Sequence, residues 1–324
     1  MIASAHPDSL RTHQLALAFE RQVLLELSLV LLRTAPACQR RQVQAMCRRL
    51  VAEQHSAWAG AAHTWQARRS VPGADPDGWC SHTLELLQLA LTRRSPAPGG
   101  FSVVDQAASW ASQALAAVEA QLARETGEAP GLIPGHSLAG EGERQLRSAW
   151  ELLGRLWPEA AGCVTRLVSE VVWFSGDRYF STTAPYAFGA IFVNPRAHWC
   201  LPHYLETLLH EGGHLELMAE QAHDPLLHNG AALASSPLRD DARPLSAVLH
   251  AVFVLTRMVQ GHRRYLACGE ALPDRNVAKD LLAARQRVLA SSLSTLLHHA
   301  QPTARGEAFL HSLGRVVAAT LEAA

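Results

Sequence analysis

The stretch Leu208-Leu209-His210-Glu211-Gly212-Gly213-His214 is the most informative part of this 324-residue sequence. It has the pattern H-E-x-x-H, which predicts a helix that presents two histidines to one metal ion. Residues four apart in a helix lie about 40° apart around the axis and about 6 Å apart along it, so both imidazoles can reach one ion. With 17 histidines and 29 acidic residues in the chain, fewer than roughly 0.08 such matches are expected by chance. We therefore interpret His210 and His214 as metal ligands rather than as ordinary polar residues of a helix.

The residues between the two histidines carry further information. Glu211 points beside the metal rather than at it, and in zinc peptidases this glutamate is the general base that acts on metal-bound water. Gly212 and Gly213 are unusual, because each glycine inside a helix costs about 1 kcal/mol relative to alanine. Two explanations stay open: another backbone or a ligand approaches the helix closely here, or neighbouring elements hold the helix well enough to tolerate both glycines.

A third ligand is needed, and two common peptidase patterns do not supply it. The metzincin pattern requires glycine and histidine at the positions of Leu217 and Glu220, and the thermolysin-like pattern requires a glutamate near Leu233. We favour His250, because its apolar neighbours predict a helix that faces the core, although a lone histidine in such a helix is usually an ordinary core residue. The candidates downstream of the motif are His223, His228, Asp240, Asp241 and His250.

A dense charge cluster, Arg239-Asp240-Asp241-Ala242-Arg243, precedes the helix predicted for His250. Arg243 and His250 are seven residues apart and would lie nearly on one helical face, so Arg243 could present a guanidinium near the metal. The cluster is equally typical of helix N-capping and of a surface ion-pair network. Both interpretations stay open.

The rest of the chain predicts a mainly α protein with a small antiparallel β-sheet, an α+β fold. Residues 167–174 and 189–194 are rich in β-branched and aromatic side chains and predict two strands of that sheet. Apolar residues at helical spacing predict helices before and after the strands, with Pro244 in a first helical turn. The predicted helices span residues 103–124, 143–156, 202–222, 244–267, 276–299 and 307–323.

Glycine and proline are concentrated between residues 127 and 142, which indicates a domain boundary. We therefore divide the chain into a helical N-terminal region, residues 1–140, and a metal-binding catalytic region, residues 141–324. Peptide recognition is one interpretation of the first region, whose tryptophans would line a groove, and a conventional helical core is the other. The tryptophans concerned are Trp58, Trp65, Trp79 and Trp110.

Composition excludes several classes of protein. Hydrophobic residues make up 48% and charged residues 18%, which is too apolar for a disordered chain. A formal net charge of +0 argues against a nucleic-acid or anionic-membrane binder, which would need a basic face. The sequence has no secretory pattern near its start and no apolar run long enough to span a bilayer, so it predicts a cytoplasmic protein. Lys279 is the only lysine, which disfavours Schiff-base chemistry and leaves arginine to bind carboxylates.

Three segments resemble the HExxH-motif peptide-modifying proteins of bacterial ribosomal-peptide clusters. They are residues 208–214, residues 236–253 with their Arg-Asp-x-Arg-Pro pattern, and the strand of residues 188–194, and the resemblance covers roughly residues 150–262. It implies a zincin-like helix that bears the HExxH motif under a short β-hairpin. It also implies an iron(II)/2-oxoglutarate-dependent oxygenase that β-hydroxylates a side chain of a ribosomally made precursor peptide.

The same resemblance implies roles for individual residues. His210, His214 and His250 would hold iron(II), with Asp240 or Asp241 in place of His250 as a minor option that restores the usual two-histidine, one-carboxylate site. Arg243, and after it Arg239, would bind the distal carboxylate of 2-oxoglutarate. Glu211 would then orient a metal-bound water or a neighbouring residue instead of acting as a hydrolytic base.

Two other functions stay open. The first is a zinc metallopeptidase in which Zn(II) replaces iron(II) and Glu211 acts as general base. The second is a helical module without enzymatic activity that binds a leader peptide. The second would predict the loss of a ligand, whereas all three candidate histidines are present. The sequence does not identify the peptide, the modified residue or the oligomeric state.

Overall fold

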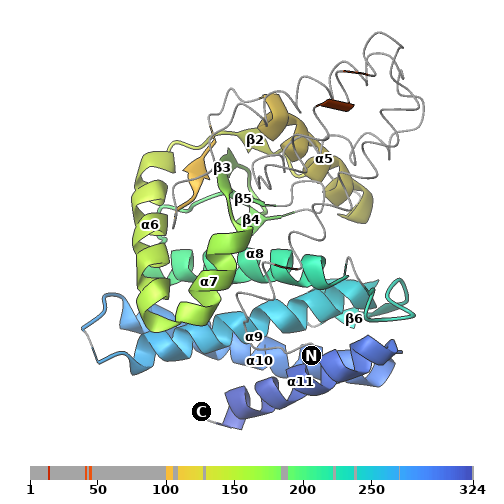
Figure 1. Ribbon diagram of the computed structural model, residues 1–324. Coiled ribbons are helices and arrows are strands. Elements are labelled where there is room, and N and C mark those ends of the chain that lie inside the picture. The colour runs from red at the N-terminus through yellow and green to blue at the C-terminus, as the bar shows by residue number, and fades with distance from the viewer. Residues whose placement is uncertain are drawn as a thin grey trace. The chain divides into compact units, whose positions relative to one another are not determined.

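The computed structural model describes residues 14, 41, 44–45, 100–104, 109–126, 129–183, 189–221, 224–236, 239–269 and 271–322. Most of the N-terminal region predicted to be helical lies outside the described residues, which include only four positions before residue 100. The side chains of the four tryptophans assigned to a peptide groove also lie outside them. Figure 1 draws the described elements as ribbons.

The chain divides into two compact units. The helical unit contains the described residues within 141–166 and 198–322, and the sheet unit contains those within 100–140 and 167–197. The protein is therefore mainly helical with a small sheet. The boundary predicted at residue 140, and the roles assigned to either side of it, stay predictions.

The sheet unit contains the two predicted strands, but their orientation differs from the prediction of an antiparallel sheet. Strand β3, Glu170–Ser175, pairs with β5, Ala190–Val193, in parallel, with Val172 opposite Phe192. The connection between them carries β4, Ser181–Thr182, which pairs antiparallel with β5 along its other edge. Because this hairpin reverses the chain before β5 begins, β5 runs in the same direction as β3.

Three further elements complete this unit. Strand β1, Ser102–Val103, pairs in parallel with β3, and β2, Ile133–Pro134, pairs antiparallel with the end of β3. Helix α5, Ser109–Thr126, begins later than the predicted helix because residues 102 and 103 belong to β1. All four residues of β5 are buried, as are all those of β3 except Ser175, which explains their continuous apolar sequence.

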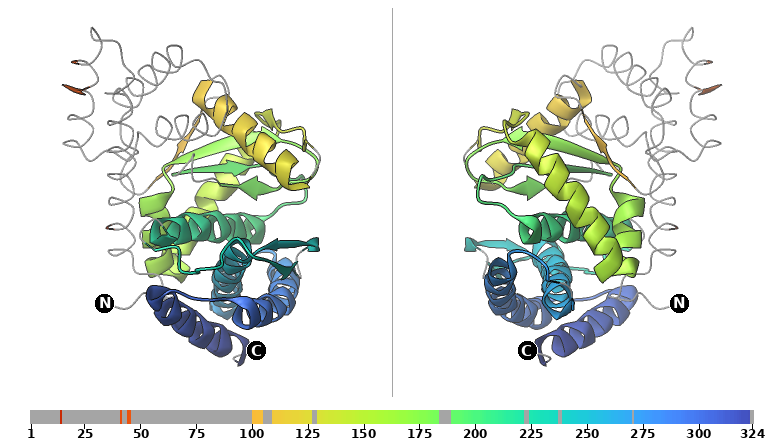
Figure 2. Two further views of the ribbon diagram at one scale, coloured as in Figure 1. Left: turned by 90° about the vertical axis from the view of Figure 1, so that its right-hand side faces the viewer. Right: turned by 90° about the vertical axis from the view of Figure 1, so that its left-hand side faces the viewer.

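The helical unit is built around α9, Leu245–Ala267, which packs along α8, Leu201–Gln221, on one side and α10, Arg275–His299, on another (Figures 1 and 2). The helices predicted at 202–222, 244–267 and 276–299 are thereby confirmed. Helix α11, Ala304–Glu322, also packs on α9, and its apolar face joins the core. The unit further contains α6, Ala139–Leu156, α7, Pro158–Leu167, and the hairpin of β6, Leu233–Ser236, with β7, Arg239–Pro244.

The paired glycines of the motif lie where neighbouring helices come close to α8. A Cβ atom on Gly212 would lie 2.9 Å from Cγ2 of Val164 in α7, and one on Gly213 would lie 3.1 Å from Cγ1 of Val254 in α9. Both distances are shorter than ordinary van der Waals contact. A close approach therefore explains the two glycines, and valine side chains make it rather than a backbone or a ligand.

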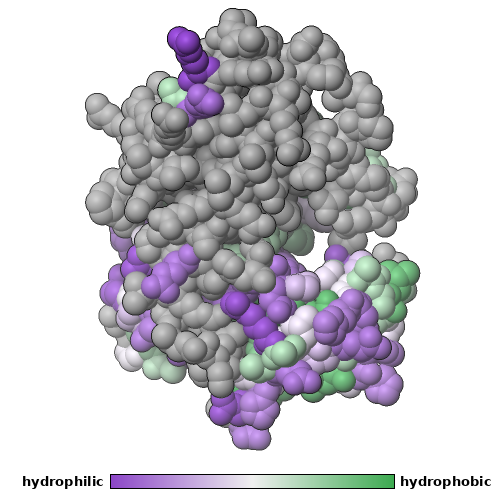
Figure 3. All heavy atoms as spheres, turned by 45° about the vertical axis from the view of Figure 1, so that its right-hand side comes forward, coloured by the Kyte–Doolittle hydropathy of each residue, from purple (hydrophilic) through white to green (hydrophobic). Residues whose placement is uncertain are grey.

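The surface of the described residues is mixed in character. On the face in Figure 3, hydrophilic and hydrophobic side chains of the helical unit are intermingled. Among the described helices, none combines the length and the apolar character that crossing a bilayer requires.

Candidate metal centre

Three histidines predicted to act together lie side by side between α8 and α9. Nε2 of His210 and Nε2 of His214 are 3.1 Å apart, and Nδ1 of His214 is 2.9 Å from Nδ1 of His250. The rings of His210 and His214 meet edge to face at 80°, whereas those of His214 and His250 lie within 26° of parallel. The sequence therefore identified three neighbours correctly. They form a row with His214 in the middle.

The spacing of the first two histidines fits a shared metal ion. Two nitrogens that each lie about 2.1 Å from one ion are about 3.0 Å apart at a right angle and about 3.4 Å apart at the tetrahedral angle. The 3.1 Å between the Nε2 atoms of His210 and His214 falls within this range. His250 faces the opposite nitrogen of His214. As the side chains lie, the described part of the chain contains no group of three or more His, Cys, Asp or Glu residues that could hold a metal ion.

Hydrogen bonds define which nitrogens of the row are available. Nε2 of His250 lies 2.7 Å from Oε1 of Gln221, and because an amide oxygen only accepts, His250 donates this bond. Nδ1 of neutral His250 therefore accepts a hydrogen bond from Nδ1–H of His214. Nε2 of His214 is left with its lone pair directed to the side of His210. This is the nitrogen that a metal ion between His210 and His214 would bind.

Two neighbours of the row were not predicted. Gln221 fixes His250, and the sulfur of Met258 lies 3.4 Å from Nδ1 of His210. Both follow helical periodicity, because Gln221 is seven residues after His214 in α8 and Met258 is eight residues after His250 in α9. A search for polar or sulfur-containing residues at these spacings would have found them.

The histidines are held in the neutral form that binds metals. Burial lowers the pKa of both His210 and His250 to about 4. Burial also lowers the pKa of His214 well below its usual value, and the charges of His210, His250 and Arg243 lower it further. At neutral pH all three imidazoles therefore keep a lone pair. The side chain of His210 is 34% exposed, so this end of the row is reachable from solvent.

Glu211 differs from the other buried glutamates of α8. Glu206, Glu216 and Glu220 each form an ion pair with an arginine of another helix. The side chain of Glu211 is completely buried, and its Oε1 lies 3.8 Å from Nε2 of His210. The glutamate of the motif therefore lies beside the proposed metal position. The partners of the other three are Arg285, Arg257 and Arg305 respectively.

The charge cluster before α9 is a strand and not the start of the helix. Ala234 of β6 pairs with Arg243 of β7, and α9 begins at Leu245. The prediction that Arg243 and His250 share a helical face is therefore wrong, and Pro244 precedes the first helical turn rather than lying in it. The hairpin causes this, since its backbone pairing extends to Pro244. Arg243 nevertheless acts on the site, because its positive charge lowers the pKa of His214.

The remaining candidates do not enlarge the site. His228 is exposed, and its backbone N–H donates to the carbonyl oxygen of Gln301. His223 lies outside the described residues, as do the side chains of Arg239, Asp240 and Asp241. No family model matches the chain, and no curated protein is similar enough to count as a relative.

Proposed function

We propose that this protein is an iron(II)/2-oxoglutarate-dependent oxygenase that β-hydroxylates a side chain of a ribosomally made precursor peptide in the cytoplasm. The observation that carries the proposal is the pair of neutral imidazoles, His210 and His214, whose Nε2 atoms lie 3.1 Å apart. A guanidinium whose charge reaches His214 supports it further, because 2-oxoglutarate is a dicarboxylate and needs a cation. In this proposal α8 is a zincin-like metal helix.

The chain's own residues divide the work. His210 and His214 would hold iron(II) through Nε2, and His250 would be the third ligand once its ring turns from the far nitrogen of His214. In the arrangement seen here, His250 orients His214 through a hydrogen bond, and Gln221 fixes the tautomer of His250. When bound, iron(II) supplies oxygen activation coupled to decarboxylation of 2-oxoglutarate.

Arg243 is the first choice for the distal carboxylate of 2-oxoglutarate, and Arg239 is the second. Arg243 is half-buried at the end of β7, next to the start of α9. A guanidinium there would bind a carboxylate through two parallel hydrogen bonds, which a lysine could not do. Glu211, enclosed within the helix packing, would orient His210 or a water molecule.

A zinc metallopeptidase is the second candidate. The 3.8 Å distance between Oε1 of Glu211 and Nε2 of His210 favours it, because a general base must lie beside the metal. The two candidates differ in what they require of Arg243: the oxygenase needs a cation for its co-substrate, whereas metal-assisted hydrolysis does not.

Metal content and co-substrate turnover test the proposal. Full-length protein is loaded anaerobically with iron(II) and then exposed to air with 2-oxoglutarate and with the peptides encoded by short reading frames next to its gene. The products are assayed for succinate and for a 16 Da gain in peptide mass. We expect both products with wild type and with His228→Ala, loss of bound iron with His214→Ala, and a raised KM for 2-oxoglutarate with Arg243→Gln. Peptide cleavage with zinc(II) and no 2-oxoglutarate would establish the peptidase instead, and wild-type protein that binds neither metal would overturn both.

A further inference from the structure

A pocket lies between α9 and α11. It is a cavity of about 400 Å³, a volume that suits a small molecule. Of the eight described residues that line it, three are arginines, Arg263, Arg264 and Arg315, and none is acidic. No sequence pattern predicted this pocket.

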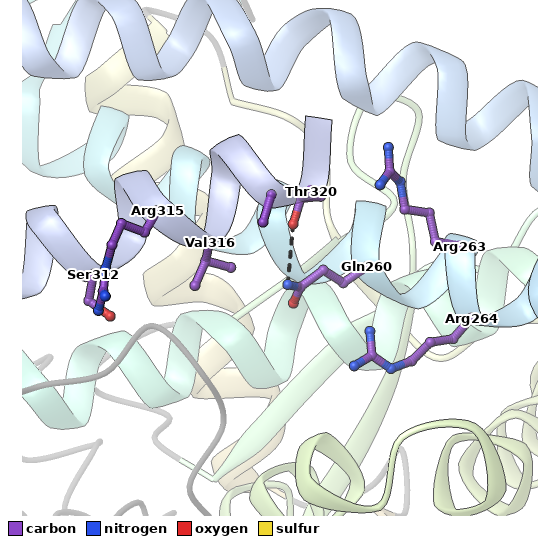
Figure 4. A pocket seen from close by; sticks show the side chains of 8 residues that line it. Gln260, Arg263, Arg264, Ser312, Arg315, Val316 and Thr320 are labelled. Atoms are coloured by element: carbon purple, nitrogen blue, oxygen red, sulfur yellow. Dashed lines mark hydrogen bonds between the residues drawn. The ribbon is translucent and has the colours of Figure 1, made fainter. Parts of the chain in front are cut away.

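The accessible lining of the pocket is mostly apolar, with arginine side chains toward either end. Figure 4 shows Arg263 and Arg264 rising from α9 at one end, and Arg315 on α11 at the other. Val316 lies between the two ends, beside Gln260 (Figure 4). A ligand in this space would lie along an aliphatic surface, with arginine side chains near its two ends.

Among the described residues that line the pocket, two buried atoms have no hydrogen-bond partner. They are Nη2 of Arg263, which is a donor, and Oε1 of Gln260, which is an acceptor. Gln260 is held in place because its Nε2 donates to Oγ1 of Thr320 over 3.3 Å, so its Oε1 is the atom left without a partner (Figure 4). Both atoms have almost no exposed surface. Buried polar atoms are rarely left unsatisfied. A small rotation of each side chain would bring the two atoms to a ligand that accepts from Arg263 and donates to Gln260.

The three arginines are not equivalent. The guanidinium of Arg264 lies 4.1 Å from the ring centroid of Trp157, which fixes its position. Arg263 is partly buried, and burial lowers its pKa. Arg315 is exposed and can be replaced without disturbing the core. Arg263 and Arg315 are therefore the residues that an anion would depend on most.

We propose that this pocket binds a small organic anion that also carries a hydroxyl group, of the hydroxycarboxylate or polyol phosphate class. The guanidinium groups select the negative charge, and Oε1 of Gln260 selects the hydroxyl donor. Gln260 is ten residues beyond His250 on α9, about 15 Å along the helix axis, so the pocket is separate from the histidine row. The proposal does not depend on metal binding or on oxygenase activity.

Calorimetric titration of the full-length, metal-free protein tests the proposal. Citrate represents the hydroxycarboxylates and glycerol 3-phosphate the polyol phosphates, with inorganic phosphate, glycerol and sodium chloride at matched ionic strength as reference ligands. We expect saturable binding of citrate or glycerol 3-phosphate with a Kd of about 1 mM or tighter, and at least about 10-fold weaker binding of inorganic phosphate. Whichever of the two probes binds identifies the class.

Variants localise the binding. Arg263→Gln and Arg315→Gln should each raise the Kd by about 10-fold or more, while Arg287→Gln, an exposed arginine of α10 outside the pocket, should not change it. Arg315→Gln keeps the test valid if Arg263→Gln unfolds, which circular dichroism would show. The proposal is wrong if neither probe saturates, or if Arg315→Gln binds as tightly as Arg287→Gln.

Discussion

At the scale of single residues, the site was predicted where one helix determines the geometry. His210 and His214 meet because residues four apart in a helix lie on one face. The apolar neighbours of His250 predicted that it lies near the other two histidines. They did not predict the orientation of its ring, because that depends on a hydrogen bond with Gln221 between two helices. Likewise, no sequence pattern assigns arginine partners to Glu206, Glu216 and Glu220 of α8, because the partners come from three different helices.

Glu206 should make the stability of the protein sensitive to acid. Burial alone would raise its pKa, but hydrogen bonds from His262 and Arg285, together with their charges, outweigh burial and lower it to about 2. Because the folded value lies below the ordinary 4.5, this stabilisation is present above about pH 4.5 and is lost as the pH falls toward 2. It amounts to about 3 kcal/mol at neutral pH.

Urea unfolding of wild type and Glu206→Gln between pH 7 and pH 3 measures this effect. The difference in unfolding free energy should shrink by about 2 kcal/mol between pH 5 and pH 3, because the wild type alone loses the carboxylate. Thr256→Val is the control, since it removes a buried hydroxyl that does not titrate. A gap for Glu206→Gln that is as constant with pH as the control's would contradict the assignment.

Arg257 should be more important for stability than its charge alone suggests. Its Nη2 donates to both carboxylate oxygens of Glu216 at 2.8 Å, and its guanidinium lies 4.8 Å from the ring centroid of Phe253. Arg257→Met would leave the Glu216 carboxylate buried without this cation, at a cost of about 3–5 kcal/mol. Arg147→Met, in the exposed pair with Glu143, should have almost no effect.

The double variant Glu216→Met/Arg257→Met separates the ion pair from the packing. Once both charges are removed, most of the lost stability should return, because the cost of Arg257→Met comes from an uncompensated buried carboxylate. Chemical denaturation of the two single variants and the double variant provides the comparison. A double variant no more stable than Arg257→Met would place the loss in packing against Phe253 instead.

At the scale of elements, the helices could be predicted and the sheet direction could not. Helical periodicity is local, so the bounds of α8, α9 and α10 differ from the predicted ones by no more than one residue. Strand direction depends on which edges pair, and the short β4, which had no strand signal of its own, decided it. The continuous apolar run of β3 was the available sign, since strands buried on both faces are typical of parallel pairing.

Two glycines of α11 should respond in opposite ways to alanine. A Cβ on Gly306 would lie 1.8 Å from the carbonyl oxygen of Leu226. That oxygen cannot easily move, because it accepts a hydrogen bond from the backbone N–H of Thr303 and Leu226 already has a φ of 66°. Gly306→Ala should therefore destabilise by about 2–3 kcal/mol. Gly314 has no such neighbour within 4 Å, so Gly314→Ala should stabilise by about 0.5–1 kcal/mol through helix propensity. Thermal unfolding of both variants decides, and an equal effect of the two would refute the contact.

At the scale of the whole molecule, the histidine row and the anion pocket both belong to the helical unit. The elements that contribute to them, α8, α9, α11 and β7, lie within residues 198–322. The division of the chain into units was not visible in the sequence, because residues 167–197 join residues that precede 141. A composition shift marks a boundary along the chain, but it does not show which distant segments pack together.

Metal binding should therefore stabilise one unit selectively. At a free metal concentration 100-fold above its Kd, a site present only in the folded state adds about 2.7 kcal/mol, which raises the Tm by about 5 °C. Cobalt(II) and zinc(II) are suitable probes because they are stable in air. Hydrogen exchange should slow most in peptides of α8 and α9, while peptides of β3 and β5 change little. The rise should disappear with EDTA and with His214→Ala and persist with His228→Ala, since only His214 lies in the row. If His214→Ala showed the same rise as wild type, the metal would be binding elsewhere and the row would be a structural hydrogen-bonded chain.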